Sequence, residues 1–217
     1  MKNEALNILY EDNSILVCVK PAGVATESAN MRTPDMVSMA KSYLKPAKYL
    51  GVVHRLDQPV SGILVMAKTQ AAAASLSKQL QGDDMGKYYT ATVEGEITDS
   101  DPTLITNYLI KDSKAGKALI VSENQKGPDG KPAREAKLTF EVKSYNPEND
   151  TTELLVKLLT GRFHQIRAQL SNIGHPILGD VKYGAMTDRY PKGQIALCAS
   201  ELHFKHPETM KDMKFTI

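Results

Sequence analysis

Short apolar runs with the spacing of β-strands dominate the chain. They are rich in Val, Ile and Leu, and some alternate apolar with polar positions, which is typical of strands that are buried on one or both faces. Five segments have this character and are predicted to form strands: 14–19, 62–67, 87–95, 137–142 and 152–159.

Two segments have helical spacing instead. The first begins at Thr69, a residue type that caps helix N-termini, and runs through Leu80 to Gly82, which favours termination. The second follows the last predicted strand, and Gly174 is expected to end it. Its apolar positions recur with the period of a helix, at Phe163, Ile166, Leu170 and Ile173.

The order of these elements predicts the fold class. Strands with interspersed helices indicate an α+β fold, with a central mixed, mainly antiparallel β-sheet that is flanked by helices and loops. No internal repeat, low-complexity block or Ser/Gly-rich linker divides the sequence. Residues 1–217 are therefore expected to form a single domain, and a chain of this length can bury a substantial core.

Composition excludes several classes of protein. The chain is 41% hydrophobic and 24% charged, which is typical of a folded globular protein and not of a collagen-like, disordered or coiled-coil one. The net charge is only +2 with His neutral, so a polyanionic partner must be met by a local basic surface. Residues 111–137, here called the basic arm, hold seven Lys/Arg against four acidic residues and include a Gly- and Pro-rich surface loop at 124–133.

The cysteines and the N-terminus bear on the compartment. Cys18 and Cys198 lie within apolar stretches, which suits buried thiols better than a disulfide and favours a reducing environment. The N-terminus lacks the pattern of a signal peptide, and no apolar run approaches the ~18 residues that cross a bilayer. We therefore expect a cytoplasmic protein without a membrane partner.

Polar residues before the strand at 62–67 form the first candidate site. If the strand that precedes them continues to Asp57, alternation places Arg55 and Asp57 on one face and His54 and Leu56 on the other. A cation and a carboxylate would then project together. A surface ion pair beside a turn is the alternative interpretation.

The second candidate site lies at the start of the second helical segment, where Arg162, His164, Gln165 and Arg167 are crowded together. Helix N-termini attract anions, and two arginines strengthen that preference. We expect an anion here, either a phosphate or a carboxylate such as Asp57. The alternative is a capped amphipathic helix with solvated arginines.

A third candidate is the tyrosine pair that opens the strand at 87–95. Alternation places Tyr89 on one face with Ala91 and Val93, and a tyrosine beside small residues can offer its ring to a nucleobase. Cross-strand packing of that tyrosine is the alternative.

Other chemistries lack their motifs. The sequence has no GxGxxG, complete P-loop, CxxC or HExxH pattern, so nucleoside-triphosphate chemistry and a metal site are not expected. Two Ser–Lys pairs, Ser38 with Lys41 and Ser75 with Lys78, lack the companion motifs of Ser–Lys enzymes and are predicted to lie on helix surfaces.

Six segments together resemble the RluA-type pseudouridine synthases. They occur in the order of that family and extend over residues 8–207, and HRLD followed by SG and later by GRxHQIR is a highly specific combination. The segments are KPAGV (20–24), HRLDQPVSG (54–62), KYYTATVEG (87–95), TGRFHQIRAQL (160–170), GHPILGDVKYG (174–184) and LCASELHFKHP (197–207).

The resemblance implies an enzyme that isomerises specific uridines to pseudouridine in ribosomal or transfer RNA, without cofactor or metal. It places the catalytic carboxylate at Asp57, which either attacks the nucleoside or takes a proton from its ribose. It also implies that Arg162 pairs with Asp57, that Tyr89 stacks on the uracil, and that Ile166 supplies apolar packing near the pocket.

A uridine in folded RNA must be flipped out of its stack before it can react. Arg55 is the candidate to fill the vacated place, because a guanidinium both stacks on bases and binds phosphate. Further RNA contacts are expected from the basic arm and from His54, Gln165, Arg167 and Lys182, with structural hydrogen bonding as the alternative for the histidine.

The sequence departs from the family pattern at Val60, Cys198 and Phe163, where the family has Thr, His, and Thr or Arg respectively. None of these departures falls on the three catalytic positions. The first strand of the catalytic domain begins near residue 8, so we expect no N-terminal S4 domain, and we expect a monomer.

Two other functions remain open at this point. One is a non-catalytic RNA-binding factor that has kept the fold. The other is a nucleoside or glycoside hydrolase, which usually needs a second carboxylate, and Asp180 is a weak candidate for that role. The sequence does not indicate which RNA or which uridine is the substrate.

Overall fold

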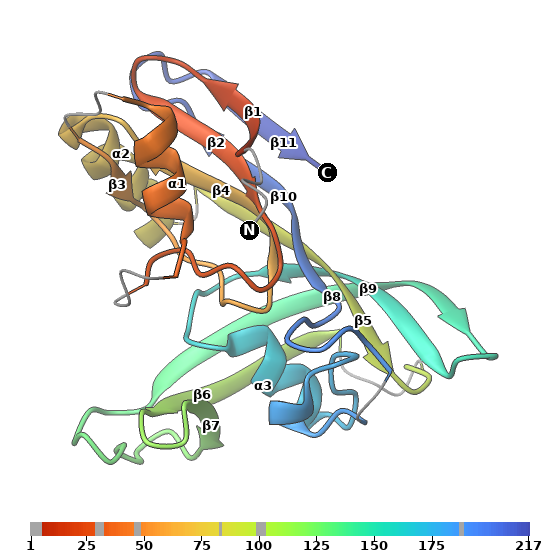
Figure 1. Cartoon of the computed structure of the whole chain (residues 1–217). Coiled ribbons are helices and arrows are strands. Elements are labelled where there is room, and N and C mark those ends of the chain that lie inside the picture. Colours follow the sequence, from red (N-terminus) through yellow and green to blue (C-terminus); the bar gives the residue numbers. More distant parts are fainter. Residues whose placement is uncertain (1–5, 29–32, 46–48, 83, 99–102, 187–188) are drawn as a thin grey trace. The chain divides into compact units, whose positions relative to one another are not determined.

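The computed structural model describes residues 6–28, 33–45, 49–82, 84–98, 103–186 and 189–217 (Figure 1). The chain forms two compact units. Unit 1 comprises Met1–Lys87 and Cys198–Ile217, and unit 2 comprises Tyr88–Leu197. Each unit has helices packed on a layer of strands, so the predicted α+β class is confirmed.

The strands of unit 1 follow the order β1-β2-β4-β10-β11, and the two-residue β3 also pairs with β4. β10 is parallel to β4 and the other pairs are antiparallel, so the sheet is mixed, as predicted. The elements of this unit are β1 (Asn7–Glu11), β2 (Ile15–Lys20), α1 (Met36–Tyr43), β3 (Gly51–Val52), β4 (Ser61–Ala67), α2 (Gln70–Gln81), β10 (Leu197–Lys205) and β11 (Asp212–Thr216).

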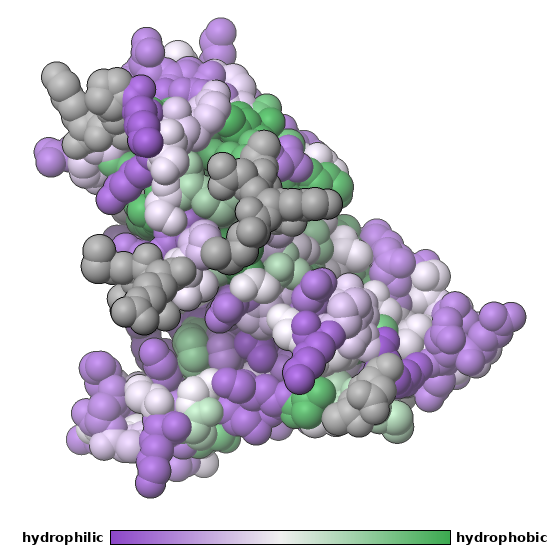
Figure 2. Space-filling view, viewed as in Figure 1, coloured by the Kyte–Doolittle hydropathy of each residue, from purple (hydrophilic) through white to green (hydrophobic). Residues whose placement is uncertain are grey.

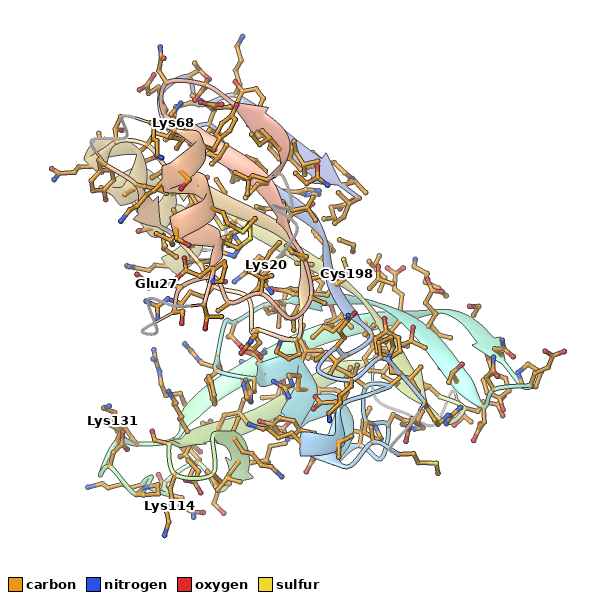
Figure 3. The ribbon with its side chains drawn as sticks, viewed as in Figure 1. Lys20, Glu27, Lys68, Lys114, Lys131 and Cys198 are labelled. Carbon is orange, nitrogen blue, oxygen red and sulfur yellow. The ribbon has the colours of Figure 1, made fainter. Side chains whose placement is uncertain are left out.

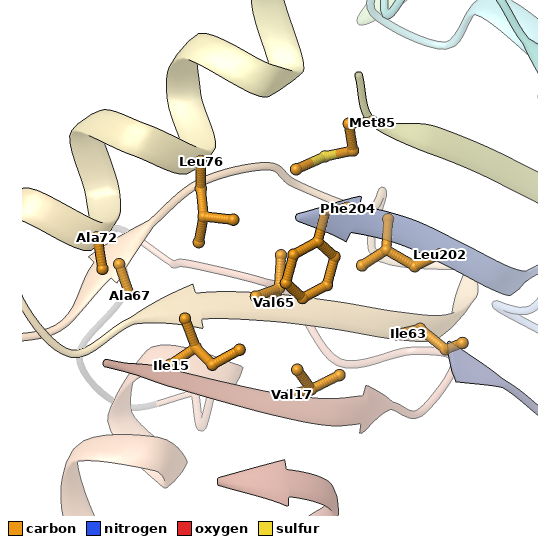
Figure 4. Packing of buried hydrophobic residues seen from close by; sticks show 10 residues of the cluster. All are labelled: Ile15, Val17, Ile63, Val65, Ala67, Ala72, Leu76, Met85, Leu202 and Phe204. Carbon is orange, nitrogen blue, oxygen red and sulfur yellow. The ribbon is translucent and has the colours of Figure 1, made fainter. Parts of the chain in front are cut away.

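Strands β2 and β4 are apolar except at one end, Lys20 in β2 and Ser61 in β4, because both of their faces are covered. Ile15 and Val17 point to the face that packs against α2, and the alternate residues Leu16 and Cys18 point to the face that packs against α1. Figure 4 shows the first of these clusters, in which Leu76 of α2 lies over the sheet. The uninterrupted apolar runs in the sequence therefore reflect burial on two sides.

Both helices of unit 1 have side-chain caps at their N-termini. The predicted α2 is confirmed: Thr69 is its N-cap and accepts a hydrogen bond from the N–H of Ala72 at 3.1 Å, and Gly82 follows its last residue. α1 begins after Asp35, whose side chain accepts from the N–H of Ser38 while the Ser38 hydroxyl accepts from the N–H of Asp35. This reciprocal pair satisfies two backbone donors that a helix start leaves open.

The strands of unit 2 follow the order β5-β9-β8-β6-β7. α3 packs on this layer through Ala168, which meets Leu109, Ala118 and Ala136. The elements are β5 (Gly86–Glu94), β6 (Leu104–Asp112), β7 (Lys117–Val121), β8 (Arg134–Asn146), β9 (Thr151–Leu158), α3 (Gln165–Asn172) and the 3-10 turn η1 (Val181–Tyr183).

The surface of unit 2 is polar where its hairpins end. The basic arm comprises the end of β6, all of β7, the surface loop at 124–133 and the start of β8, and Lys114 and Lys131 lie on it (Figure 3). The far end of the β8–β9 hairpin is also exposed, and hydrophilic residues gather there in Figure 2. The loop predicted at 124–133 is confirmed.

Helix α3 begins later than its apolar pattern predicts. His164 has left-handed backbone angles (φ 50), so the helix starts at Gln165 and Phe163 lies before it. Ile166 and Leu170 are buried as expected, but the prediction that Phe163 shares their buried face is wrong, because that side chain is 37% exposed.

Three other features of the described residues concern the sequence predictions. Both cysteines are free thiols, as predicted, and burial raises the pKa of Cys18 to about 12. Within the described ranges no group of three or more His, Cys, Asp or Glu side chains has an arrangement that suits a metal ion. No helix in the same ranges has the length and apolar character needed to cross a bilayer.

Candidate active site

Asp57 lies in an irregular segment of unit 1 between β3 and β4. β3 ends at Val52, so the strand alternation considered for Arg55 and Asp57 does not reach them. The segment closes in a turn in which the N–H of Val60 donates to the carbonyl of Asp57 at 3.0 Å. This turn delivers the chain to β4.

Thr26 fixes the residue that precedes Asp57. Its hydroxyl oxygen accepts from the N–H of Leu56 at 3.1 Å and donates to the carbonyl of Leu56 at 2.9 Å. Thr26 and Leu56 are 3% and 5% exposed, so water does not compete for these bonds. The backbone on the N-terminal side of Asp57 is thereby held.

Gln58, the residue after Asp57, is bound to the segment 20–24. The N–H of Gly23 donates to the carbonyl of Gln58 at 2.8 Å, and the side-chain amide of Gln58 donates to the carbonyl of Gly23 at 3.0 Å. Asp57 therefore lies between two residues whose backbones are bonded to one neighbouring segment. This arrangement fixes the backbone on both sides of the Asp57 carboxylate.

Lys20 completes this support from inside unit 1. The side chain is fully buried at the end of β2, and its ammonium group donates to the carbonyls of Pro21, Val24 and Gln58 at 3.0, 2.6 and 3.1 Å. Burial lowers the pKa of Lys20 to about 8, and the negative charge of Asp57 opposes that shift. A cation is thus bonded to the segment that carries Asp57; Figure 3 labels Lys20.

His54 serves the fold of this segment. Its Nε2 atom accepts from the N–H of Val65 in β4 at 3.3 Å. Burial, and then the charge of Lys87, lowers the pKa of His54 to about 4, so the ring is neutral at neutral pH. The structure therefore favours the structural alternative for His54 over the expected RNA contact.

Arg55 is the most accessible member of the first candidate site. Its side chain is 72% exposed and pairs with Glu27 at 2.9 Å. An exposed pair of this kind contributes little to stability, so Arg55 can leave Glu27 for an RNA at small cost. The expected role of Arg55 stays a prediction.

Tyr89 lies in unit 2, on β5. Its side chain is 8% exposed and alternates with the buried residues Ala91 and Val93, so the predicted face is confirmed. The neighbouring Tyr88 lies on the opposite face, with the ammonium group of Lys157 at 5.7 Å from its ring centroid. Stacking of Tyr89 on a uracil stays a prediction.

Gln165 organises the loop that carries Arg162. Its side-chain oxygen accepts from the Thr160 hydroxyl at 2.7 Å and from the N–H of Arg162 at 3.0 Å, and its amide donates to the carbonyl of Lys137 at 3.0 Å. Gln165 is 3% exposed, which differs from the expected RNA contact. The guanidinium of Arg162 donates to the carbonyl of Glu135 at 2.8 Å, and burial lowers the pKa of Arg162.

Arg167 also differs from its expected role at an RNA surface. It is 5% exposed, and its guanidinium binds both carboxylate oxygens of Asp180 at 2.6 and 2.8 Å. Asp180 is 1% exposed and is committed to this pair, so it does not suit the second carboxylate of a hydrolase. The charge of Arg167 is thus paired with that of Asp180 in the interior of unit 2.

Of the two remaining candidate residues, Ile166 lies within α3 and Lys182 lies after it. Ile166 is 4% exposed, as a residue that supplies apolar packing should be. Lys182, in η1, is exposed, and its ammonium group donates to the carbonyl of Gly116 at 3.2 Å. Lys182 is therefore accessible to an RNA phosphate.

The candidate residues are divided between the two units. Unit 1 holds His54, Arg55 and Asp57, and unit 2 holds Tyr89, Arg162, Gln165, Ile166, Arg167 and Lys182. The pairing of Arg162 with Asp57 stays a prediction. Sequence reasoning assigned no role to Lys20 or Thr26, although a lysine that ends an apolar strand directly before Pro21 is an unusual placement for a charge.

Most of the chain matches one known protein family. The family described as RNA pseudouridylate synthase matches residues 14–172, a span that includes the segment of Asp57 and the loop of Arg162. The chain belongs to this family. The prediction from the RluA-type resemblance, that the chain is a member of the pseudouridine synthase family, is thereby confirmed.

Two curated relatives of this pseudouridylate synthase family member come from bacteria. A ribosomal large subunit pseudouridine synthase C from Buchnera aphidicola subsp. Schizaphis graminum is 33% identical over 98% of this chain and 67% of the relative. The protein of that name from Vibrio vulnificus is 32% identical over 95% of this chain and 64% of the relative. The chain thus spans about two thirds of the length of these relatives.

Solved structures support the fold. Human RNA pseudouridylate synthase domain containing 1 matches with a TM-score of 0.77 and 23% identity, over 99% of this chain and 83% of that one. Human RNA pseudouridylate synthase domain containing 4 matches with a TM-score of 0.74 and 20% identity, over 97% and 87%. The α+β architecture is therefore that of pseudouridine synthases.

Proposed function

We propose that this chain converts specific uridines of structured RNA into pseudouridine, with Asp57 as the catalytic carboxylate. The observation that carries the proposal is the support of the Asp57 segment, whose two neighbours are bonded to the segment 20–26 by Thr26, Gly23 and Lys20. Such rigid presentation is what a reacting group requires. A protein that only bound RNA would gain nothing from a half-buried carboxylate held in this way.

The reaction exchanges one bond to the ribose for another. The bond between N1 of uracil and C1′ breaks, the base turns in place, and C5 forms a bond to C1′. The proton on C5 is then lost, and N1 ends with a proton. Asp57 acts either as the nucleophile or as the base that takes a ribose proton, and no redox partner is needed.

The other residues complete the site in the proposal. Arg162 pairs with Asp57 and keeps the carboxylate ionised. Tyr89 stacks on the uracil, and Arg55 fills the place that the flipped uridine leaves. The names of the relatives favour large-subunit ribosomal RNA as the substrate, with transfer RNA as the second choice. A cytoplasmic monomer remains part of the proposal.

The first test measures tritium release from RNA labelled at C5 of uracil, because formation of the C5–C1′ bond expels that hydrogen. Wild type and Asp57→Asn are compared on unmodified large-subunit ribosomal RNA and transfer RNA. We expect release by wild type and none by Asp57→Asn, with RNA binding retained in both. Asp212→Asn, at an exposed position of β11 in the same unit, is the matched control and should behave as wild type.

Two results would overturn the proposal. Tight binding of both RNAs by wild type without tritium release would indicate a non-catalytic RNA-binding factor. Release of free uracil in place of tritium would indicate a hydrolase.

A further inference from the structure

Phe163 has an exposed aromatic ring, and the ring of the neighbouring His164 holds it in position. The ring stacks on that of His164, with centroids 3.8 Å apart and planes inclined by 19°. It lies outside α3 and is 37% exposed, an uncommon state for a phenylalanine. All the residues concerned belong to unit 2.

His164 is held rigidly although its backbone conformation is unfavourable. Its Nε2 atom is 3.1 Å from Nη1 of Arg167, which can only donate, so Nε2 accepts and Nδ1 carries the proton. Nδ1 then donates to the hydroxyl oxygen of Tyr183 at 2.9 Å, and that oxygen also accepts from the N–H of Ala118 at 2.7 Å. These bonds sustain a left-handed residue that is not glycine, and such strain is concentrated at functional positions.

Three lysines surround this stack. The ammonium group of Lys111 lies 4.6 Å from the ring centroid of Phe163, and that of Lys117 lies 5.8 Å from the ring of Tyr183. Lys182 is adjacent in the chain to Tyr183. Burial is the largest cause that lowers the pKa of His164, and the charges of Arg167, Lys182 and Lys111 lower it further. Among the residues that the structure describes, none of the three lysines forms an ion pair.

Two acidic groups near these lysines have other hydrogen-bond partners. Asp180 is bound to Arg167, and Asp112 accepts hydrogen bonds from the N–H groups of Lys114 and Ala115 in the β6–β7 turn. The local surface therefore presents positive charge around one exposed ring. Protein interfaces are depleted in lysine, whereas single-stranded RNA is bound by aromatic rings bordered by cations.

We propose that the Phe163 platform, defined as Phe163, His164 and Tyr183 with Lys111, Lys117 and Lys182, stacks on an unpaired base of the RNA and binds the flanking phosphates. Phe163 offers the ring, and the flexible side chain of Lys111 moves from the ring to a phosphate when the base arrives. This inference rests on the proposed function for the identity of the RNA. It assigns substrate contacts to a position where the family has Thr or Arg.

The test compares RNA affinity and steady-state kinetics of Phe163→Leu, Phe163→Trp and wild type on the unmodified ribosomal RNA transcript. Leucine keeps an apolar side chain but removes the ring, so binding should weaken about tenfold, within the range that a lost base stack produces. Phe163→Trp should keep the affinity of wild type, and the loss in Phe163→Leu should lie in KM.

Tyr145→Leu is the matched control. Tyr145 is 36% exposed and belongs to the same unit, but its hydroxyl donates to Asp150, and both Asp150 and Glu96 raise its pKa. An aromatic ring in acidic surroundings should not meet RNA, so this variant should bind as wild type does. Lys111→Gln should reduce the slope of log affinity against log salt by about 0.7, and Phe163→Leu should leave that slope unchanged.

The platform is overturned if Phe163→Leu binds RNA as tightly as wild type, or if Phe163→Trp loses as much affinity as Phe163→Leu. Dissociation of a dimer by Phe163→Leu at unchanged RNA affinity would assign the ring to a second copy of the chain and would also overturn it. RNA binding is measured separately from tritium release. If wild type binds RNA but releases no tritium, the proposed function is refuted, and the affinities of the variants still show whether the Phe163 platform contacts RNA.

Discussion

The buried ammonium group of Lys20 stabilises the fold and also holds the backbone next to Asp57. A lysine without solvent contact is costly unless each of its donors is used, and here three carbonyls accept from it. One of these carbonyls belongs to Gln58, directly after Asp57. Any displacement of Lys20 is therefore transmitted through one peptide unit to the carboxylate.

Lys20→Met should lower both stability and turnover. Unsatisfied buried carbonyls cost about 1–3 kcal/mol each, so the free energy of unfolding should fall by several kcal/mol. Loss of the support beside Asp57 should reduce kcat by about 100-fold, the effect of a displacement of about 1 Å at a reacting group. Urea unfolding and single-turnover tritium release measure the two effects.

Lys68→Met is the control for that variant. Lys68 belongs to the same unit and binds Glu11 and the carbonyl of Asp12, at the opposite end of β4 from the Asp57 segment. It should lose stability but keep kcat. Equal loss of kcat in the two variants would show that Lys20 acts through general stability alone.

At the scale of elements, β4 and β10 approach so closely that only glycine fits at Gly62. Its φ of +128° is unfavourable for other residues, and an added Cβ atom would overlap the backbone of Ala199 in the neighbouring strand. Gly62 follows the turn that begins at Asp57. The strand pairing therefore also sets where the Asp57 segment ends.

Gly62→Ala should destabilise the protein by about 2–4 kcal/mol, because the strands must separate or the backbone must strain. Thermal unfolding of purified variants measures this loss. Gly130→Ala, in the surface loop, is a control for positive φ without crowding, since nothing lies within 4 Å of its added Cβ. Comparable losses in the two variants would contradict the importance of the close approach.

The elements that sequence predicts well are those in which local chemistry and burial agree. α2 has Thr69 before it and Gly82 after it, and β2 and β4 each contain an uninterrupted apolar run that is buried on both faces. The start of α3 was misplaced because apolar spacing cannot reveal the left-handed backbone of His164, which tertiary bonds impose. β6 and β7 were not predicted, because β6 departs from strict alternation where Leu109 and Ile110 are both buried, and β7 has only five residues.

In the candidate site, too, the sequence predicts some features and not others. Motifs give Asp57, Tyr89 and Arg162 as candidate site residues, because the sequence matches the motifs of the family at these positions. Motifs do not show whether a polar side chain points to solvent or to the interior. Gln165 and Arg167 lie in one motif and are both buried, and the partners that explain this lie on other elements.

For the molecule as a whole, two neutral histidines link stability to pH. Burial is the largest cause in each case, and it lowers the pKa of His54 to about 4 and that of His164 to about 3 from an ordinary value of 6.5. One lies in unit 1 and the other in unit 2. In the unfolded chain both rings regain their ordinary pKa values.

Stability should therefore fall as the medium becomes acidic. Between pH 6.5 and the lowered pKa values the unfolded chain binds more protons than the folded one, so acid favours unfolding. The contribution of each histidine is fully present above pH 6.5 and declines by at most about 1.4 kcal/mol per pH unit below it. Urea unfolding at a series of pH values from about 7 to 4.5 measures the slope.

His54→Gln should separate this effect from the titration of carboxylates. The glutamine oxygen can accept from the N–H of Val65 as the histidine does, but it does not titrate. The variant should lose some stability at pH 7 through imperfect packing, yet its free energy of unfolding should fall less steeply with acid than that of wild type. Parallel slopes for the two proteins would show that His54 has the same pKa in the folded and unfolded chain, and the assignment of a neutral ring bonded to β4 in acid would be wrong.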